Sequence, residues 1–415
     1  MYQLDWAAQL RAGKAPAFTR FGAVSPTVWR LGCTSFFTDI SSEMVSSILP
    51  IYFVVHLHFS PLQFGILDGI YQGAAVALLS LLSGIYADRR GLQKEVATAG
   101  YALSALAKAG LLVAGNVWPV VAGVLTVDRV GKGIRTAPRD AMISLSSHRG
   151  ALATAFSVHR GMDAGGAVVG PLLAFLLLRA LPGSFDLVLV TSACIALAGL
   201  GVIGLLVDRP QGVARQNNQS PSLRLSSDLR RQAGFGPIVL VGGILCAVTA
   251  SDGFIYLMIG KNTNSSASLI PFFAFLTALS YLLFSVPAGW LADRWGRSKV
   301  FLAGYTIVAL IYAVLLCPGL GNIAQYALVA LFGLYYAATD GVLAAMASAT
   351  LAAELRTSGL ALMNTVNSLS RLVSSVLFGL LWVSGTRQTP LWFFLFGSVA
   401  AILISGIILI NRSRA

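Results

Sequence analysis

The sequence predicts an all-α membrane protein in which twelve transmembrane helices form two six-helix bundles. Of its 415 residues, 56% are hydrophobic and only 11% are charged, whereas soluble proteins contain about 25% charged residues. Apolar runs of about 20 residues, the length that crosses a bilayer, recur twelve times along the chain. The stretch Gly84–Lys94 (GIYADRRGLQK) returns half a chain later as Gly289–Lys299 (GWLADRWGRSK), so the chain consists of two similar halves in tandem.

The apolar runs also predict how the chain is divided. We expect a tail at 1–27, a first bundle at 28–207, a polar linker at 208–236, a second bundle at 237–410 and a short tail at 411–415. The predicted spans of the first bundle are 28–56, 62–87, 93–114, 117–143, 151–180 and 186–207. Those of the second bundle are 237–260, 268–292, 298–318, 322–349, 356–384 and 390–410.

The distribution of basic residues predicts the orientation in the membrane. Of the 29 Lys and Arg residues, 20 lie in the tails and in the loops on the same side as the tails, and three lie in the loops on the other side. Because cytoplasmic loops are enriched in Lys and Arg, both termini are expected in the cytoplasm of a bacterial cell, with the helices in its inner membrane. The net charge of +13 therefore reflects topology and indicates no nucleic-acid partner.

The two matching turns resemble a signature of the major facilitator superfamily of secondary transporters, Gly-x-x-x-Asp-Arg-x-Gly after the second helix of each half. In this chain the signature residues are Gly84, Asp88, Arg89 and Gly91 in the first half and Gly289, Asp293, Arg294 and Gly296 in the second half. The first copy departs from the family pattern at Leu92 and Gln93, where basic residues are usual. The resemblance covers essentially the whole chain and implies two bundles that rock around a central site, with these turns as a gate on the cytoplasmic side.

Charged residues inside the predicted spans also fit this fold. A charge near the bilayer centre costs at least about 2.5–3.5 kcal/mol, so it needs a polar interior or a cavity. These charges avoid the sixth, ninth and twelfth helices, and the third contains only Lys108. In the superfamily every third helix faces lipid, and the others surround the cavity.

The first helix carries a candidate proton site. Asp39 and Glu43 lie one helical turn apart on one face. Two ionised carboxylates at this spacing repel each other in a partly desolvated cavity, so the pair is a candidate to bind and release a proton. The alternative is a permanent salt bridge with arginines of the fourth helix.

The fourth helix contains more charges than any other span, in the string VDRVGKGIRTAPRDAM. Lys132 and Arg135 share a face with Asp128, and we expect both to contact substrate. Arg129 and Gly133 resemble the superfamily's Arg-x-x-x-Gly motif, whose arginine is tied to proton coupling in proton-driven members. Together with FFTDISSEM in the first helix, this string also resembles a bacterial subgroup without a substrate that we can name.

The fifth helix, with the string HRGMDAGGAVVGP, points towards export. Gly166-x-x-x-Gly170-Pro171 resembles a signature common in drug and proton antiporters. His159 and Asp163 at i, i+4 are candidates for proton transfer or for a structural pair, and Arg160 is a candidate cavity residue. GxxxG alone is weak evidence, since small residues pack membrane helices of every function.

The second half offers further candidate substrate contacts on one face of each of three helices. These are Asp252 and Tyr256, Tyr336 and Asp340, and Asn364, Asn367 and Arg371. The asparagines are equally compatible with a role in packing helices together.

Taken together, these patterns favour proton-coupled efflux of a small amphipathic or drug-like compound by a monomeric transporter. Proton-coupled uptake of an organic anion is the alternative, favoured by the interior basic residues. A membrane-embedded sensor or enzyme would leave the matched halves unexplained. With no Walker-type loop and no His-Glu-x-x-His, the sequence predicts no enzyme activity, cofactor or metal; the expected partners are a small-molecule substrate, protons and the lipid bilayer.

Overall fold

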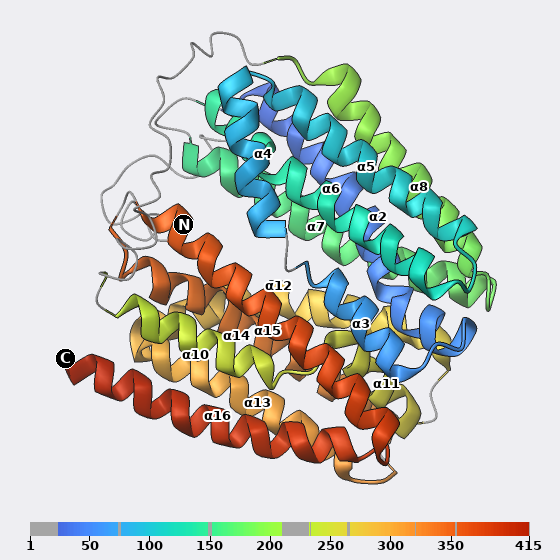
Figure 1. The fold of residues 1–415 in the computed structure, drawn as a ribbon, viewed down its shortest axis with the longest axis vertical. Coiled ribbons are helices and arrows are strands. Elements are labelled where there is room, and N and C mark those ends of the chain that lie inside the picture. Colours follow the sequence, from blue (N-terminus) through green and yellow to red (C-terminus); the bar gives the residue numbers. More distant parts are fainter. Residues whose placement is uncertain are drawn as a thin grey trace.

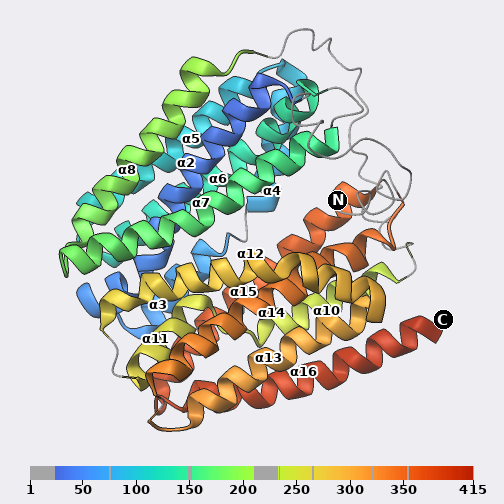
Figure 2. The same cartoon turned by 180° about the vertical axis from the view of Figure 1, so that it is seen from behind.

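The computed structural model describes residues 24–73, 76–147, 152–209, 232, 234–263, 266–319, 321–352 and 355–414. The predicted tail up to residue 23 and most of the predicted linker, 210–231, lie outside these described residues. Within them the chain is helical, and the helices fall into two groups that correspond to the two halves of the sequence (Figures 1 and 2). The prediction of an all-α membrane fold with two bundles is confirmed.

Nine segments in the described part of the chain are long and apolar enough to cross a membrane, and one of them, Phe235–Asn262, comprises two successive helices. The first bundle comprises α2 (Pro26–Ile51) with the π-helical turn η2 (Tyr52–His56), α3 (Pro61–Tyr71), α4 (Val76–Arg90), α5 (Gln93–Val113), α6 (Trp118–Leu145), α7 (Leu152–Ala180), and α8 (Phe185–Gly201) with η3 (Val202–Leu206). The second comprises α10 (Phe235–Ala247), α11 (Asp252–Asn262), η4 (Ala267–Leu269) with α12 (Ile270–Trp295), α13 (Arg297–Leu316), α14 (Asn322–Ser348), α15 (Arg356–Ser384) and α16 (Thr389–Arg414).

Helix starts follow local sequence signals. Ser25 caps α2 by accepting from the Val28 N–H at 3.4 Å, and Pro26 occupies the first helical turn. Ser60 and Gln63 form a reciprocal capping box at the start of α3. These signals are readable from the sequence because they involve residues no more than three apart.

Two predicted spans are broken, which corrects the expectation of continuous helices. The second span divides into α3 and α4, and the seventh into α10 and α11. At the second break, the Tyr312 hydroxyl accepts from the Ala250 N–H at 2.7 Å, and Ser374 Oγ donates to the Thr249 carbonyl at 2.6 Å. Backbone groups freed by a break inside a membrane need such partners, so residues far away in sequence make this break possible.

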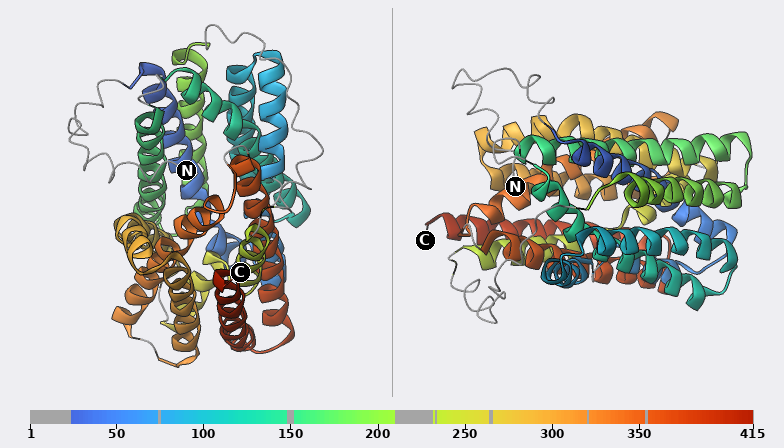
Figure 3. Two further views of the ribbon diagram at one scale, coloured as in Figure 1. Left: turned by 90° about the vertical axis from the view of Figure 1, so that its left-hand side faces the viewer. Right: turned by 90° about the horizontal axis from the view of Figure 1, so that it is seen from above.

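The two bundles meet at one end and diverge at the other. We call the end near residues 24 and 414 the terminal end and the opposite one the distal end. At the distal end α3 packs on α15 and α7 packs on α12, whereas the bundles separate towards the terminal end (Figures 1 and 2). In the left view of Figure 3 the first-half helices lie above those of the second half, and α3 reaches towards the second bundle.

The outer helices are covered with apolar side chains. Helix α16 lies on the outside of the second bundle (Figure 1) and exposes Phe396, Leu403 and Ile407 by more than half of their surface. On the outside of the first bundle, α8 exposes Leu197 and the following η3 exposes Leu205 similarly. Such surfaces suit contact with lipid, as expected for the sixth and twelfth spans.

Candidate functional site between the bundles

The acid pair of α2 lies against α7 because two glycines let the helices approach. A Cβ on Gly166 would lie 2.6 Å from the Phe36 carbonyl oxygen, and one on Gly170 would lie 3.0 Å from Glu43 Cβ. Asp39 and Glu43 are both half-buried, and Glu43 accepts from Ser46 Oγ at 3.0 Å. The glycines of the fifth span therefore position the carboxyl pair of the first span.

Lys132 of α6 is the basic residue most closely associated with this acid pair. Its side chain is exposed, and it interacts electrostatically with both Asp39 and Glu43. An exposed charge in mid-span avoids lipid, so it faces a polar interior. The structure thus brings together Asp39, Glu43 and Lys132 from two helices.

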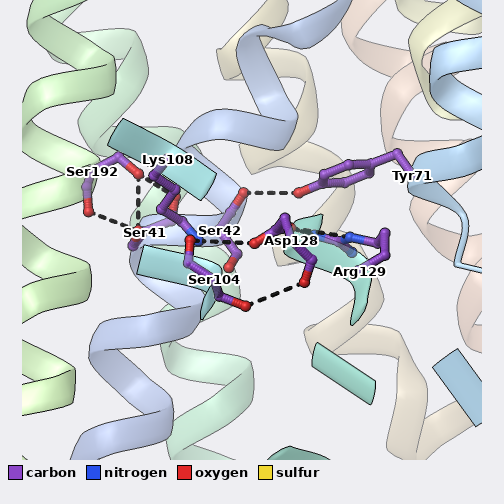
Figure 4. Close-up of polar contacts among 8 residues, drawn as sticks. All are labelled: Ser41, Ser42, Tyr71, Ser104, Lys108, Asp128, Arg129 and Ser192. Atoms are coloured by element: carbon purple, nitrogen blue, oxygen red, sulfur yellow. Dashed lines mark hydrogen bonds and ion pairs between the residues drawn. The ribbon is translucent and has the colours of Figure 1, made fainter. Parts of the chain in front are cut away.

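Arg129 lies deeper, in a closed cluster inside the first bundle (Figure 4). Its guanidinium pairs with the carboxylate of Asp128 and lies 3.7 Å from the centre of the Tyr71 ring. Lys108 Nζ lies 3.4 Å from the other oxygen of Asp128, and Ser104 Oγ donates to the Asp128 carbonyl at 3.2 Å. In this conformation the predicted partner of the acid pair is therefore already paired with Asp128.

Arg135 is also buried. Its side chain is only 4% exposed, and its guanidinium lies 4.6 Å from the centre of the Tyr101 ring. Arg139, one turn further on, pairs with Asp140 at 2.9 Å. The expectation that Arg135 contacts substrate finds no support in this placement, because the side chain points into the first bundle and packs against α5.

The predicted His159–Asp163 contact is present near the terminal end of α7. His159 Nδ1 lies 3.6 Å from Asp163, and its Nε2 lies 2.9 Å from Ser35 Oγ on α2. Arg160 is 68% exposed and lies 4.0 Å from the same carboxylate. The histidine therefore links α2 to α7, and its part in proton transfer stays a prediction.

The second bundle contributes a chain of polar side chains from three helices. The Tyr336 hydroxyl donates to the Asp252 carboxylate and lies 3.5 Å from Arg371 Nη1. Arg371 Nη2 lies 3.8 Å from Asp340, a residue whose side chain is half exposed. The structure thus brings together these four predicted residues, Asp252, Tyr336, Asp340 and Arg371, as a connected group.

The other predicted residues of the second bundle lie apart from this group. Tyr256 is 4% exposed, and its hydroxyl donates to Thr277 Oγ1 of α12 at 2.9 Å. Its hydrogen bond therefore joins two helices of the second bundle. Asn364 is exposed, whereas Asn367 is half-buried. The Asn367 amide packs closely on Gly242, where an added Cβ would lie 2.9 Å from its Oδ1. Of the two asparagines, Asn364 is thus the more accessible.

Asp68 was not among the predicted site residues, yet it lies where the bundles meet. Its Oδ2 accepts from Ser375 Oγ of α15 at 2.6 Å, and it interacts electrostatically with Asp252 of α11. The sequence signal was an acid inside an apolar span. Nothing local indicated that its partner lies 307 residues away.

The two signature turns lie at the terminal end, where the bundles diverge. Asp88 is exposed and accepts from Gln93 of its own turn at 3.1 Å, while Arg89 is exposed. Gly84 packs against Ala137 of α6, and Gly91 has a φ of +65°, which favours glycine.

The second turn is built similarly but is ion-paired. Asp293 pairs with Arg297 at 3.0 Å, and Gly296 has a φ of +104°. The guanidinium of Arg294 lies 5.3 Å from the Trp290 ring, and Gly289 has open space around it. Within the described residues, the hydrogen bond of Asp88 and the ion pair of Asp293 both stay inside their own turns, so neither engages the predicted gate in this conformation.

Two membrane-spanning bundles with ionisable side chains between them are typical of membrane transporters. The chain belongs to the Major Facilitator Superfamily, whose family model matches residues 31–259 and 240–415. It is 31% identical to an uncharacterised MFS-type transporter of Methanocaldococcus jannaschii over 398 residues, 93% of this chain and 95% of that protein. It is 25% identical to a multi-drug resistance efflux pump PmrA homologue of Lactococcus lactis, covering 68% of this chain and 69% of that protein.

Solved transporters share the fold. A crystal structure of the nucleoside transporter NupG superposes with a TM-score of 0.77, covering 92% of this chain and 99% of that one, at 15% identity. A peptide transporter POT structure gives a TM-score of 0.77 over 93% of this chain and 94% of that one, also at 15% identity. At this identity the likeness concerns the fold alone.

Proposed function

We propose that this protein exports a small amphipathic or drug-like compound across the bacterial inner membrane in exchange for protons. The observation that carries this proposal is the carboxyl pair Asp39 and Glu43, half-buried between α7 and the exposed Lys132. A carboxylate in such surroundings changes its interactions when it binds a proton. The similarity to a protein named as a drug efflux pump homologue supports the direction of transport.

The coupling would work through a change of partners. When ionised, a carboxylate of the pair attracts Lys132 and, further inside, Arg129, with which Glu43 interacts electrostatically. When protonated, it releases that attraction. Proton occupancy would in this way bias the equilibrium between the two orientations of the bundles.

The charges at the bundle interface favour a substrate that carries a cationic group. Four basic residues of the first bundle, Lys108, Arg129, Arg135 and Arg139, are more than nine-tenths buried. By contrast, Asp39, Glu43, Asp252 and Asp340 are half-buried or exposed. Acidic groups therefore outnumber the accessible basic ones, which are Lys132, Arg160 and Arg371.

Uptake of an organic anion remains the second candidate, favoured by the exposure of Lys132 and Arg160. The two candidates differ in the ligand that stabilises the folded protein. A ligand that binds only the folded state raises the melting temperature by mass action. Melting curves would therefore be measured with two fluorescent dyes, an amphipathic amine and an organic carboxylate. A higher melting temperature with the amine favours export of a cation, and one with the carboxylate favours uptake of an anion.

Asp39→Asn tests the mechanism. In proteoliposomes with an imposed pH gradient, we expect this variant to lose gradient-driven movement of the bound dye while energy-independent binding persists, because the amide mimics a permanently protonated acid. Glu43→Gln should have a smaller effect if Glu43 serves to perturb its neighbour. Normal pH-dependent transport by Asp39→Asn would contradict coupling through α2 and shift attention to Asp252, Asp340 or the His159–Asp163 pair.

We also propose that the protein works as a monomer with both termini in the cytoplasm. A reporter fused after Ala415 and another inserted near Gln219 should both give a cytoplasmic signal, because Lys and Arg are concentrated on that side. A periplasmic signal at either position would reverse the topology.

A further inference from the structure

Helix α3 lies directly against α15 of the other bundle, and three glycines make this approach possible. A Cβ on Gly65 would lie 2.5 Å from the Ser375 carbonyl oxygen, and one on Gly69 would lie 3.2 Å from Leu372 Cα. From the other side, a Cβ on Gly379 would lie 2.4 Å from the Pro61 carbonyl oxygen. The two backbones are in contact over several turns, so this face is built to close tightly at the distal end.

Asp68 is an ionisable side chain on this tight face. Its carboxylate accepts from Ser375 Oγ at 2.6 Å and interacts with Ser251 and Gln72, all neutral groups. The electrostatic neighbour across the interface is another acid, Asp252 of α11. When ionised in the closed contact, Asp68 is therefore partly desolvated and faces a like charge.

The cations on the neighbouring helices are already engaged. On α15, Arg371 contacts Tyr336 and Asp340. On α6, which also packs against α3, Arg129 is paired with Asp128 and stacked on Tyr71. Asp68 forms no ion pair with any other described residue.

We propose that Asp68 is a second proton-binding site, and that proton binding there favours closure of the distal end. The neutral acid fits between the bundles, whereas the ionised acid gains water and distance from Asp252 when the contact opens. The inference deepens the proposed function and depends on it. In an exporter, a proton taken up from outside would close the distal end, and its release inside would favour reopening.

A distance measurement tests this without a known substrate. Spin labels would be placed at Val113→Cys on α5 and Ile323→Cys on α14, two distal positions that are each 86% exposed, after the native Cys33, Cys194, Cys246 and Cys317 are replaced. The full chain in nanodiscs would be measured between about pH 5 and pH 9, a range in which a half-buried carboxyl can titrate. We expect short distances at low pH and a growing long-distance population as pH rises.

Three variants should change this response in different ways. Asp68→Asn should keep the short distance at every pH. Ser375→Ala removes a donor that stabilises the ionised acid in the closed contact, so opening at high pH should be more complete. Asp252→Asn removes the repulsion across the interface, so opening at high pH should be less complete.

The matched control is Asp186→Asn, which removes an exposed acid at the distal end, at the start of α8. Its distances should change with pH as those of the parent do. A parent without a pH response, or an Asp68→Asn variant with the parent's response, would overturn this inference. If Asp68→Asn does not fold, the opposite changes in Ser375→Ala and Asp252→Asn decide instead, and equal responses in both would overturn it. Failure of the proposed function would appear separately, as intact gradient-driven transport in Asp39→Asn.

Discussion

The two bundles share a plan but fill their interiors with different chemistry. In the first bundle, Lys108, Asp128 and Arg129 form a closed charged cluster from α5 and α6 (Figure 4). In the second, aromatic rings fill the corresponding space between α13 and α14. The rings of Tyr305 and Tyr335 meet edge to face, with their centres 5.3 Å apart. Both rings are nearly or fully buried.

This difference separates two ways of stabilising a bundle. A closed cluster of charges in a low-dielectric interior depends on every member, since the loss of one leaves its partners unpaired. Aromatic packing loses only the contacts of the altered ring. Substitutions that change a buried charge in the first bundle should therefore lower the free energy of unfolding more than substitutions of single aromatic side chains in the second bundle.

The largest expected effect is that of Asp128→Asn. It leaves Lys108 and Arg129 buried without their carboxylate, so the free energy of unfolding should fall by about 3–5 kcal/mol. Thermal unfolding of purified protein in detergent measures this loss. Adding Lys108→Met should recover part of it, and a double variant that is less stable than the single one would contradict the cluster.

The aromatic interior of the second bundle offers the matched comparison. Tyr312→Phe keeps the ring and removes a hydroxyl that binds the backbone at the break between α10 and α11. We expect a loss of about 1–3 kcal/mol, since a buried N–H is left without its acceptor. A loss equal to that of Asp128→Asn in the same unfolding assay would remove the contrast between the bundles.

Helix packing should be equally demanding in both bundles. Gly170→Ala on α7 places a methyl group 2.5 Å from the Ile40 carbonyl oxygen, and Gly333→Ala on α14 places one 2.5 Å from that of Thr277. Each should cost about 1–3 kcal/mol in the same assay. The controls Gly161→Ala and Gly341→Ala, on the same helices but in open space, should be neutral or slightly stabilising. An equal cost in the controls would contradict close contact as the cause, because helix propensity alone favours alanine over glycine.

Arg135→Gln sharpens the comparison of charges. Because Arg135 is buried against Tyr101, its loss should reduce stability by about 2 kcal/mol and leave the preference among cationic, neutral and anionic ligands unchanged. Arg371→Gln, half-buried in the second bundle, should instead alter that preference. Melting-temperature shifts with the same dyes measure both, and selective loss of anion binding in Arg135→Gln would restore it as a substrate contact.

The smallest effects on stability are expected in the two signature turns. Asp293→Asn breaks an exposed ion pair with Arg297, for which about 0.2–1 kcal/mol is typical, whereas Asp88→Asn affects only a contact with Gln93. If Asp88 acts as a latch in the opposite conformation, its variant should slow transport with ligand affinity unchanged. Unchanged labelling of cysteines near the terminal end would count against the latch.

The sequence by itself determined the features that depend on near neighbours. Hydropathy located the spans, the repeated Gly-Asp-Arg-Gly pattern located the two matching turns, and helical periodicity placed Asp39 beside Glu43 and His159 beside Asp163. Helix caps at Ser25 and Ser60 follow the same logic. Each of these rests on residues within a few positions of one another, where the geometry of a helix is known in advance.

Only the tertiary structure decided where each interior charge points and where a span can break. The break at 248–251 depends on Tyr312 and Ser374, and the position of Asp68 depends on Ser375 of the other bundle. Arg135 shares its helix with the exposed Lys132 but packs on Tyr101 of α5. Period and hydropathy describe one helix at a time, whereas the partner of a buried polar group is set by which distant helix packs against it.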